Sequence, residues 1–509
     1  MAPPLLTEGT ARRRHRGRGT AGSWAALNPD YAVLACLLLA GLALRIYFTL
    51  AWHPALTGYS DSGIYFQGGV QSVWTDPLRT VGYSMFLRVL HGISPHLILV
   101  TLVQHALGLI TAALYFFMMR RLGGPRWLGL IPAAVIALAG DELFIEHAAL
   151  SDALFIFLLA VMLYGTIRAR PGEDPRPSNL VWAAAGGLAA GFGVWDREAA
   201  LELAPLFALW LVFSAGRPTR YSFLVGLVSL ATAVATVEGY ILWRHADSGL
   251  SGLTTNGNWN IYGRVAPWAD CRDFTPPVGT RALCQYTPVS QRGWLNSEFY
   301  IYSPDSPAYK LIGPAYSVSK DPYAMRRLLE FSESAIAGEP LEYLYAVWRD
   351  TLRLFNPDIS SFGDLSPQQL INYLVAGTDN HGHNPFVTYW QNLLYPHDGP
   401  EYRAHIGALE EWEKLTRLTG IPMALLMLLT LASPWLAPPG LRSPAILFAL
   451  TSLLLLFVPI FTKSYDYRFV IPVLGPMFAV GAISAWGLWL RLRRPRPLGH
   501  SGPSFVLGR

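Results

Sequence analysis

The chain has 509 residues, of which 52% are hydrophobic and only 14% are charged, whereas soluble globular chains carry about 25% charged residues. This balance excludes an ordinary soluble protein and predicts an all-α polytopic membrane protein. The net charge of +5 does not indicate nucleic-acid binding, because the basic residues form short clusters between apolar runs. Three cysteines are too few for a disulfide framework or a cysteine-based zinc site.

The N-terminal part of the chain combines a basic segment, TARRRHRGRG, with the apolar run YAVLACLLLAGLALRIYFTLAW. This order resembles a secretory signal peptide. The apolar run is too long for one, however, and no small-x-small cleavage site follows it before His53. We therefore expect residues 1–30 to form a basic cytoplasmic tail and the run to be a retained signal-anchor helix.

The apolar runs predict about ten transmembrane helices, each long enough to cross about 30 Å of hydrocarbon. They cover 31–52, 96–118, 127–143, 148–168, 180–195, 199–215, 221–243, 416–437, 444–462 and 469–490. With a cytoplasmic N-terminus, alternate loops should be basic. The basic residues at 119–126, 168–178, 216–220, Arg442 and 491–497 meet that rule. The sequence thus predicts a multi-pass protein of the cell inner (plasma) membrane with both termini in the cytoplasm.

This topology divides the chain into regions. Helices one to seven lie in 31–243, helices eight to ten in 416–490, and 491–509 is a basic cytoplasmic tail. The first outer loop, 53–95, holds amphipathic stretches such as YSMFLRVLHGI that predict interfacial helices. The segment 244–415 is rich in Trp, Tyr, Asn, Gly and Pro, and its aromatic content argues against disorder. We expect a small mixed extracytoplasmic domain there, partly helical around 322–356.

Two features of the 244–415 segment are open to a specific interpretation. Cys271 and Cys284 are expected to form a disulfide on the oxidising side of the membrane. Its aromatic residues could stack on a glycan, although such clusters more often form a small core; they include Trp259, Tyr262, Trp268 and Trp294.

Ionisable residues near membrane depth cost several kcal/mol unless they are paired or hydrated, which makes them candidate functional residues. Asp61 stands in TGYSDSGIYFQGG, about nine positions after the first apolar run. Its alternative role is to cap a helix. Arg79 follows in RTVGYSMFL, where an interfacial arginine often only reaches toward lipid headgroups.

A second cluster, DELFIEHAALSDALF at 141–155, crowds the junction of the third and fourth predicted spans. Asp141 and Glu142 could be solvated loop charges, and Glu146 and His147 are further candidates for supporting residues. Asp152 is harder to explain as a loop charge, because it stands inside an apolar run.

Two arginines complete the set. Arg197 follows the fifth predicted span in WDREAALELAP, where pairing with Asp196 or Glu198 is the alternative. Arg468 lies in KSYDYRFVIPV, and a positive charge on the outer side runs against the topology rule. Arginine binds phosphate through parallel charge-assisted hydrogen bonds, and a carboxylate can take the proton of an attacking hydroxyl. Acids and arginines at one membrane face therefore favour chemistry on a lipid phosphate with a polar acceptor.

In order and spacing, these elements resemble the polyprenyl-phosphate-sugar-dependent glycosyltransferases of the GT-C superfamily. The nearest groups are the protein O-mannosyltransferase-like branch and the lipid A aminoarabinose transferases. The resemblance covers roughly residues 30–215 and 416–490 and rests on SDSGIYF, RTVGYSMFL, LSDALF, WDREAALELAP and SYDYRFVIP. It implies a GT-C-like fold and an enzyme that transfers a hexosyl or pentosyl group from a polyprenyl-phosphate donor. The acceptor would be a hydroxyl of an extracytoplasmic glycan, lipid or protein.

The resemblance also implies roles for residues. Asp61 would be the general base and Asp152 a second catalytic acid, while Arg79, Arg197 and Arg468 would bind or support the donor phosphate. Because phosphate is a good leaving group, a general acid is less needed than in glycoside hydrolysis, and inversion is expected. A divalent cation, Mg²⁺ or Mn²⁺, could assist at Asp61 or Asp152, but no ligand set in the sequence requires one.

The sequence departs from the family at three points. The first-loop acid stands without a second acid beside it, LSDALF has Asp where many relatives have Glu, and the 244–415 insert matches neither group closely. The acceptor therefore does not carry over from either group. The alternatives are a lipid or polysaccharide transporter (a flippase without chemistry) and an oligosaccharide ligase or polymerase that uses a pyrophosphate-linked glycan.

Overall fold

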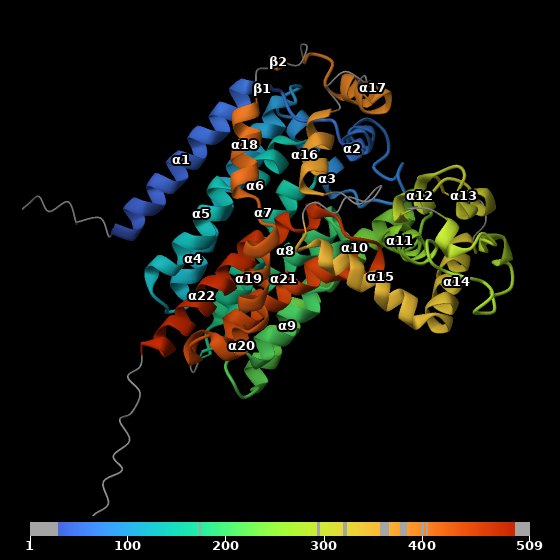
Figure 1. The fold of residues 1–509 in the computed structure, drawn as a ribbon. Helices are drawn as coiled ribbons and strands as arrows, with labels where there is room; N and C mark the ends of the chain where they lie inside the picture. Colours follow the sequence, from blue (N-terminus) through green and yellow to red (C-terminus); the bar gives the residue numbers. More distant parts are fainter. Residues whose placement is uncertain are drawn as a thin grey trace, which may run out of the picture.

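The computed structural model describes residues 29–172, 175–292, 296–318, 323–356, 366–376, 384–398, 402–403 and 406–493. Most of the two predicted tails lies outside these residues. The regular secondary structure of the described residues is helical, apart from two short strands (Figure 1). These are β1 (Trp52–His53) and β2 (Tyr402–Arg403), which pair antiparallel. The prediction of an all-α membrane protein is thus confirmed.

Long apolar helices form a bundle that makes up most of the molecule (Figure 1). Within the described residues, six helices are long and apolar enough to cross a membrane, and two bent pairs raise this number to eight at most. The six correspond to α1 (Pro29–Ala51), α4 (Ile98–Arg121), α7 (Asp152–Ala169), α10 (Arg220–Ser248), α21 (Arg442–Thr462) and α22 (Leu474–Leu492). The bent pairs are η1 (Arg126–Gly129) and α5 (Leu130–Leu138) with α6 (Gly140–His147), and α18 (Gly407–Thr416) with α19 (Gly420–Leu431).

The two remaining predicted spans are helices that do not meet this length and hydropathy requirement: α8 (Pro177–Asp196) and α9 (Leu203–Phe213). α8 is long but rich in glycine and alanine, which lets neighbouring helices approach closely. A Cβ at Gly165 of α7 would lie only 2.9 Å from the Cα of Gly186 in α8. The low hydropathy of α8 therefore accompanies tight packing inside a multi-pass bundle.

The loops carry shorter helices. The first loop contains α2 (Ser60–Val70) and α3 (Gly82–His91). The 244–415 segment contains α11 (Asn256–Val265), α12 (Ser297–Tyr302), α13 (Pro307–Ile312), α14 (Ala324–Gly338), α15 (Pro340–Arg353), α16 (Pro367–Ala376) and α17 (Pro385–Leu394). The remaining short elements are η2 (Glu198–Ala200), η3 (Arg281–Leu283), η4 (Val289–Gln291), α20 (Ser433–Leu436), η5 (Pro439–Leu441), η6 (Tyr467–Phe469) and η7 (Ile471–Val473).

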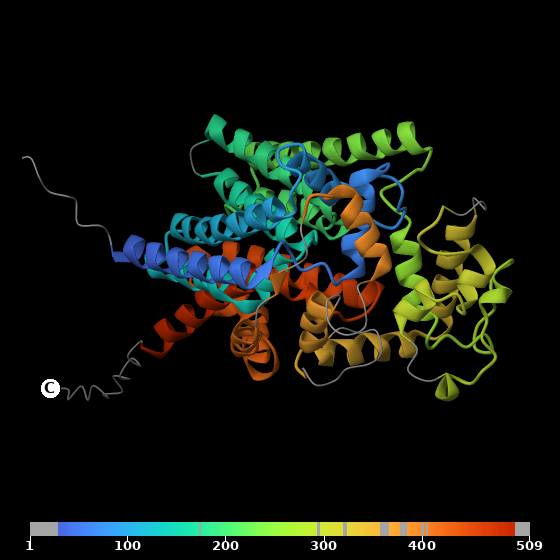
Figure 2. The same ribbon diagram turned by 90° about the horizontal axis from the view of Figure 1, so that it is seen from above.

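The 244–415 segment packs in two ways. Helices α11 to α14 surround a hydrophobic core of their own and stand to one side of the bundle (Figure 2). By contrast, buried side chains of α16 and α17, such as Leu370 and Val387, belong to the core of the bundle. Trp259 and Tyr262 are fully buried in the core of α11 to α14 and Trp268 is nearly so. A role for these three in glycan stacking is therefore wrong, and Trp294 lies outside the described residues.

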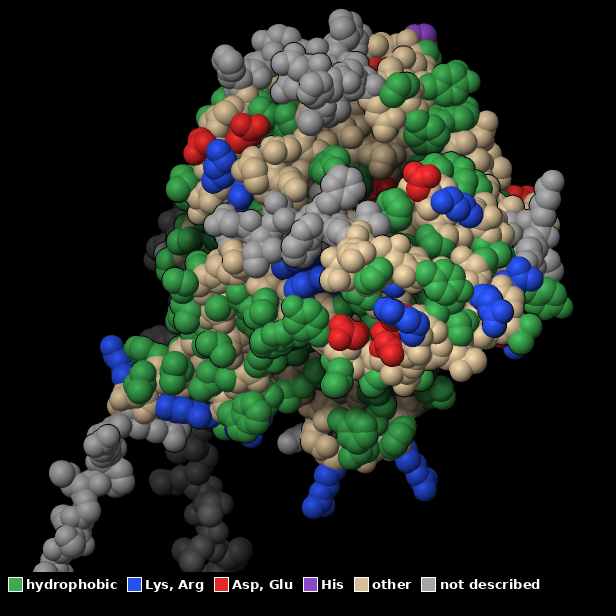
Figure 3. Space-filling model, turned by 45° about the vertical axis from the view of Figure 1, so that its right-hand side comes forward, with side chains coloured by type: hydrophobic (Ala, Val, Ile, Leu, Met, Phe, Trp, Pro, Cys, Tyr) green, Lys and Arg blue, Asp and Glu red, His purple; other side chains and the backbone are tan. Residues whose placement is uncertain are grey.

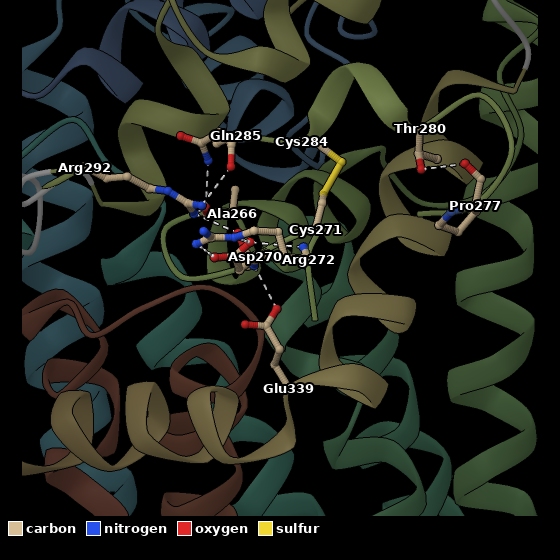
Figure 4. The surroundings of a disulfide bond; sticks show 11 residues. Ala266, Asp270, Cys271, Arg272, Pro277, Thr280, Cys284, Gln285, Arg292 and Glu339 are labelled. Atoms are coloured by element: carbon tan, nitrogen blue, oxygen red, sulfur yellow. Dashed lines mark hydrogen bonds and ion pairs between the residues drawn. A yellow bond between two sulfur atoms is a disulfide. The ribbon is translucent and has the colours of Figure 1, made fainter. Parts of the chain in front are cut away.

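A disulfide joins Cys271 to Cys284 in the loop after α11 (Figure 4). Beside it, Arg272 forms an ion pair with Asp270, whose backbone N–H donates to the Glu339 carboxylate at 2.8 Å. Glu339 lies between α14 and α15, so these contacts connect the disulfide loop to the end of the α11–α14 core.

Replacing both Cys271 and Cys284 with serine should loosen this loop without disturbing the bundle. The disulfide closes a loop with a sequence separation of 13, for which chain entropy predicts a stabilisation of about 3 kcal/mol. We expect trypsin to cut after Arg272 or Arg281, inside the loop, several-fold faster in the double variant, as followed by mass spectrometry. Cys36→Ser is the control, and equal cutting rates in both variants would show that the loop is held by its other contacts.

Candidate functional site

A cavity of about 1160 Å³ opens where segments that are distant in sequence meet. Its wall includes the start of α2, the loop before α3, the residues that follow α8, and the turn between α21 and α22. The 244–415 segment contributes further lining residues, among them Glu298 and Tyr302 of α12 and Phe386 of α17. Because the turn at Lys463 and Asp466 connects two candidate spans, the cavity lies at the end of the membrane-crossing bundle.

Asp61 faces this cavity from the first turn of α2. Its Oδ1 accepts a hydrogen bond from Nη2 of Arg79 at 2.6 Å, and its Oδ2 accepts one from Nη1 of Arg468 at 2.8 Å. α2 begins after Tyr59 without any side-chain cap bond. The helix-cap alternative for Asp61 is therefore wrong, because its oxygens are engaged by arginines.

The two arginines control the charge of Asp61. Burial alone would raise the pKa of the Asp61 carboxyl, but the guanidinium groups of Arg79 and Arg468 outweigh burial and hold that pKa well below its ordinary value. The carboxylate is thus ionised at physiological pH. It is a weak proton acceptor for as long as both arginines stay in contact with it.

Arg468 connects Asp61 to Asp152. Its Nε and Nη2 donate to Oδ2 of Asp152 at 2.9 and 2.5 Å, while Arg197 donates to Oδ1 of the same carboxylate. Asp152 is completely buried and lies behind the cavity wall, whereas both arginines line the cavity. Asp152 therefore orients two cations toward the cavity from behind.

Arg197 does not form the ion pair with Asp196 or Glu198 that was the alternative from the sequence. Asp196 has no hydrogen-bond partner for either carboxylate oxygen within the described part of the chain. Glu198 instead accepts hydrogen bonds from Thr254 and from the side-chain amide of Asn256. Both acids line the cavity, and neither forms an ion pair with Arg197, which pairs with Asp152 instead.

The position of Arg79 depends on a close approach of its loop to the end of α8. Thr80 Oγ1 donates to the backbone oxygen of Asp196 at 2.8 Å. A Cβ at Gly82 would lie 2.6 Å from the backbone oxygen of Trp195, which no real Cβ tolerates. Glycine in the RTVGY element is therefore required for the loop to rest on α8. Asp76 then fixes the guanidinium of Arg79 at 2.7 Å.

Glu146 and His147 belong to a separate buried network inside the bundle. Glu146 accepts hydrogen bonds from Nε and Nη2 of Arg45 at 2.7 and 2.5 Å, and contacts His105 Nδ1 at 2.9 Å. His147 contacts His105 at 3.0 Å. Arg45 also donates to the backbone oxygen of Ala137 at 2.7 Å, next to the break between α5 and α6. None of these side chains lines the cavity, so their support is structural.

Asp141 and Glu142 are also away from the cavity wall. Both are 1% exposed, so their interpretation as solvated loop charges is wrong. Asp141 Oδ2 accepts a hydrogen bond from the Tyr467 hydroxyl at 2.8 Å. Because Tyr467 precedes Arg468, this contact holds the turn that presents Arg468 to the cavity.

Sequence reasoning missed several residues of the cavity. Glu298 of α12 forms an ion pair with Lys463, and Asn260 of α11 lines the same wall. Nothing in the sequence indicated Glu298 or Asn260, because the 244–415 segment carries no recognisable motif. Lys463 and Asp466, by contrast, stand within the KSYDYRF element and could have been included.

Asp466 differs from Asp61 in its surroundings. Its Oδ1 accepts the backbone N–H of Arg468 at 2.8 Å, and no ion pair to its side chain is found within the described residues. Burial raises the pKa of the Asp466 carboxyl to about 6. This cavity thus contains one aspartate held ionised by arginines and another that exchanges its proton near neutral pH.

We expect Asp466→Asn to stabilise the protein at pH 8 and to have little effect at pH 4. The pKa of Asp466 is raised from an ordinary value of 3.8 to about 6, so the folded protein binds this proton more tightly than the unfolded chain does. The wild type is therefore most favoured at low pH and loses at most about 3 kcal/mol as the pH rises from about 4 to about 6. Thermal unfolding of the detergent-solubilised protein across this range tests the difference, and a constant difference at every pH would contradict it.

The oxygens of Asp61 and Asp152 are not free to bind a divalent cation. Both oxygens of Asp61 and both of Asp152 accept hydrogen bonds from guanidinium groups, which already balance their charge. Among the residues that the structure describes, no group of three or more His, Cys, Asp or Glu side chains is arranged to hold a metal. For an anion, the cavity wall offers Arg79, Arg197 and Arg468, together with Lys463, which pairs with Glu298.

Known proteins resemble the chain only distantly. No protein-family model and no curated protein matches the chain. Among solved structures, the oligosaccharyltransferase of Archaeoglobus fulgidus in its apo form matches with a TM-score of 0.46 and 14% identity, over 92% of this chain and 52% of that chain.

Two further structures are similar. AglB from Archaeoglobus fulgidus, in complex with an inhibitory peptide and a dolichol-phosphate, has a TM-score of 0.44 and 14% identity, covering 92% of this chain and 52% of that chain. The Saccharomyces cerevisiae protein O-mannosyltransferase Pmt1-Pmt2 complex bound to the sugar donor has a TM-score of 0.36 and 15% identity, covering 46% of this chain and 36% of that chain. The chain spans about half the length of these structures or less, and the similarity concerns the fold alone.

Proposed function

We propose that this protein is an integral-membrane glycosyltransferase that moves a sugar from a polyprenyl-phosphate-linked donor to an acceptor hydroxyl. The observation that carries the proposal is the meeting of Arg79, Arg197 and Arg468 with Asp61 in one cavity at the end of the bundle. Guanidinium groups recognise phosphate bidentately, and this position suits a donor whose lipid tail remains in the bilayer. We place the cavity on the extracytoplasmic side, with both termini in the cytoplasm.

The ion pairs provide a way to activate Asp61 only when the donor is bound. The donor phosphate competes with Asp61 for Arg79 and Arg468, which contact the carboxylate at 2.6 and 2.8 Å. When either guanidinium turns to the phosphate, Asp61 loses a stabilising charge and its pKa rises. The base thus gains proton affinity at the moment when the sugar is in place.

The reaction that follows is a displacement at the anomeric carbon. Asp61 takes the proton of the acceptor hydroxyl while that oxygen forms a bond to the anomeric carbon. The bond from the anomeric carbon to the phosphate oxygen breaks, and its electron pair leaves with the polyprenyl phosphate. Arg79, Arg197 and Arg468 stabilise the charge that grows on this leaving group. A single displacement gives inversion of configuration.

In this proposal Asp152 positions the arginines, whereas the family resemblance implies a catalytic role. Both of its oxygens accept hydrogen bonds from arginines, and its side chain is completely buried. Asp466 is a second candidate for the base. It lines the same cavity, and its pKa of about 6, raised by burial, is close to the value at which a general base works best near neutral pH.

The test is sugar transfer by the purified protein in lipid vesicles. The donors would be polyprenyl-phosphate mannose, arabinose, glucose and galactose, together with one pyrophosphate-linked oligosaccharide, and the acceptor a cell-envelope extract separated into glycan, lipid and protein. We expect acceptor-dependent release of polyprenyl phosphate with one of the first four donors. Turnover of only the pyrophosphate donor would favour a ligase or polymerase. Movement of a lipid between leaflets without release of any product would favour a transporter and overturn the proposal.

A further inference from the structure

Helix α15 carries an apolar stripe that no protein side chain covers in the described structure. Its members follow helical spacing and lie on one face, and all are well exposed: Leu341 77%, Leu344 54%, Tyr345 62%, Trp348 58% and Leu352 41%. Single exposed apolar residues are common, but a contiguous stripe of large ones marks a contact surface.

The opposite face of α15 buries charged groups. Asp350 is 1% exposed and forms ion pairs with Arg264 of α11 and with Arg353 one turn further along α15. A helix at a water-exposed protein surface has the reverse arrangement, with apolar residues inside and charges outside. The orientation of α15 therefore indicates surroundings that are less polar than water.

The depth of α15 is set by its contact with the bundle. The Tyr343 hydroxyl donates to the backbone oxygen of Phe461 at 3.0 Å, and Phe461 lies in the last turn of the candidate span α21. α15 therefore lies at the level where a span ends, which is where hydrocarbon gives way to headgroups. In Figure 1 it runs across the direction of α1 and α22, as a helix lying in the membrane plane would.

The end of the bundle beside α15 is also apolar and exposed. Phe461 of α21 is itself 41% exposed, directly beside the Tyr343 contact. Hydrophobic side chains cover much of the bundle in Figure 3, with few charged groups among them. Arg349 lies at the edge of the stripe with its side chain 44% exposed, although its Nε is 3.6 Å from Asp350. Trp and Tyr are the residues that favour the membrane interface.

We propose that α15 lies in the membrane surface, with Leu344 and Trp348 inserted into the bilayer and Arg349 at headgroup level. The occupant of the apolar stripe is bilayer lipid. This contact attaches the 244–415 segment to the membrane and holds Glu298 of α12 at the cavity. The proposal concerns membrane binding and does not depend on the reaction that the cavity performs.

The test uses nitroxide labels on the full-length protein in nanodiscs of phosphatidylcholine and phosphatidylglycerol. Single cysteines replace Leu344 or Trp348 in a Cys36→Ser background that keeps the disulfide. Leu450→Cys, at an exposed position in the middle of α21, is the lipid reference. Val278→Cys, at a fully exposed position in the α11–α14 part, is the water reference. Electron spin relaxation by oxygen, which partitions into lipid, is compared with relaxation by a water-soluble nickel chelate.

We expect the labels at 344 and 348 to have oxygen access between that of Val278→Cys and that of Leu450→Cys, and to show several-fold lower nickel access than Val278→Cys. Nickel access equal to that of the label at 278 would overturn the proposal, because the stripe would then face water. Exclusion of both reagents would also overturn it, since a second copy of the chain or another protein would then cover the stripe.

Discussion

Asp61→Asn is expected to lower the rate of sugar transfer about 100- to 10,000-fold, the contribution of a positioned general base. Asparagine keeps the shape of the side chain and one hydrogen-bond acceptor, so the donor should still bind. The loss should therefore appear in kcat, with little change in the KM for the donor. Release of polyprenyl phosphate measures the effect.

Two further variants make this result specific. Asp247→Asn removes an exposed carboxylate at the end of α10 and should leave the rate unchanged. Asp466→Asn removes the other candidate base of the cavity. If Asp61→Asn is as active as the wild type while Asp466→Asn is inactive, the base is Asp466. Asp61 would then only position Arg79 and Arg468.

Arg468→Met is expected to remove both donor binding and a large part of the stability. Arg468 is almost fully buried and pairs with Asp61 and Asp152. Without Arg468, the buried Asp152 carboxylate has Arg197 as its remaining ion-pair partner among the described residues. Removing one partner of a buried ion pair typically costs about 3–5 kcal/mol. Thermal unfolding in detergent reports the loss of stability, and equilibrium binding of polyprenyl phosphate reports the loss of the anion site.

A double variant separates these two effects. Adding Asp152→Asn to Arg468→Met removes the unpaired buried charge, so part of the stability should return while phosphate binding stays lost. Arg272→Met is the matched control, because Arg272 also pairs with an aspartate but is exposed, and its loss should change neither quantity. Unchanged phosphate binding by Arg468→Met would show that the arginine is purely structural.

The sequence was informative where chemistry follows from topology. Asp61, Arg79, Arg197 and Arg468 were assigned to the same side of the membrane because alternate loops must lie on the same side, and the structure brings them to one cavity. The helical fold could be predicted because each apolar run is long enough to cross the hydrocarbon core as a helix. The glycine of the RTVGYSMFL element has a local explanation, because only glycine at position 82 lets the loop approach the end of α8.

The remainder depended on tertiary contacts that no local pattern encodes. Asp152 stands 45 residues from Arg197 and 316 from Arg468 in the chain, so its burial behind the cavity could not be derived from LSDALF. The hydropathy of α8 is low because the helix is rich in glycine, and these glycines allow close packing against neighbouring helices. The entry of Glu298 into the site follows from the packing of α12, for which the sequence has no signal.

The ion pair between Asp61 and Arg468 joins residues 407 positions apart, and this separation has a consequence for biogenesis. Asp61 is made and delivered to its side of the membrane early in synthesis, whereas Arg468 arrives about 400 residues later with the turn between α21 and α22. Until then, Asp61 and Asp152 each lack a cation that the mature site provides. The cavity is therefore finished only when α21 and α22 are inserted, so a chain that has not yet reached them lacks the full set of arginines that would hold a donor.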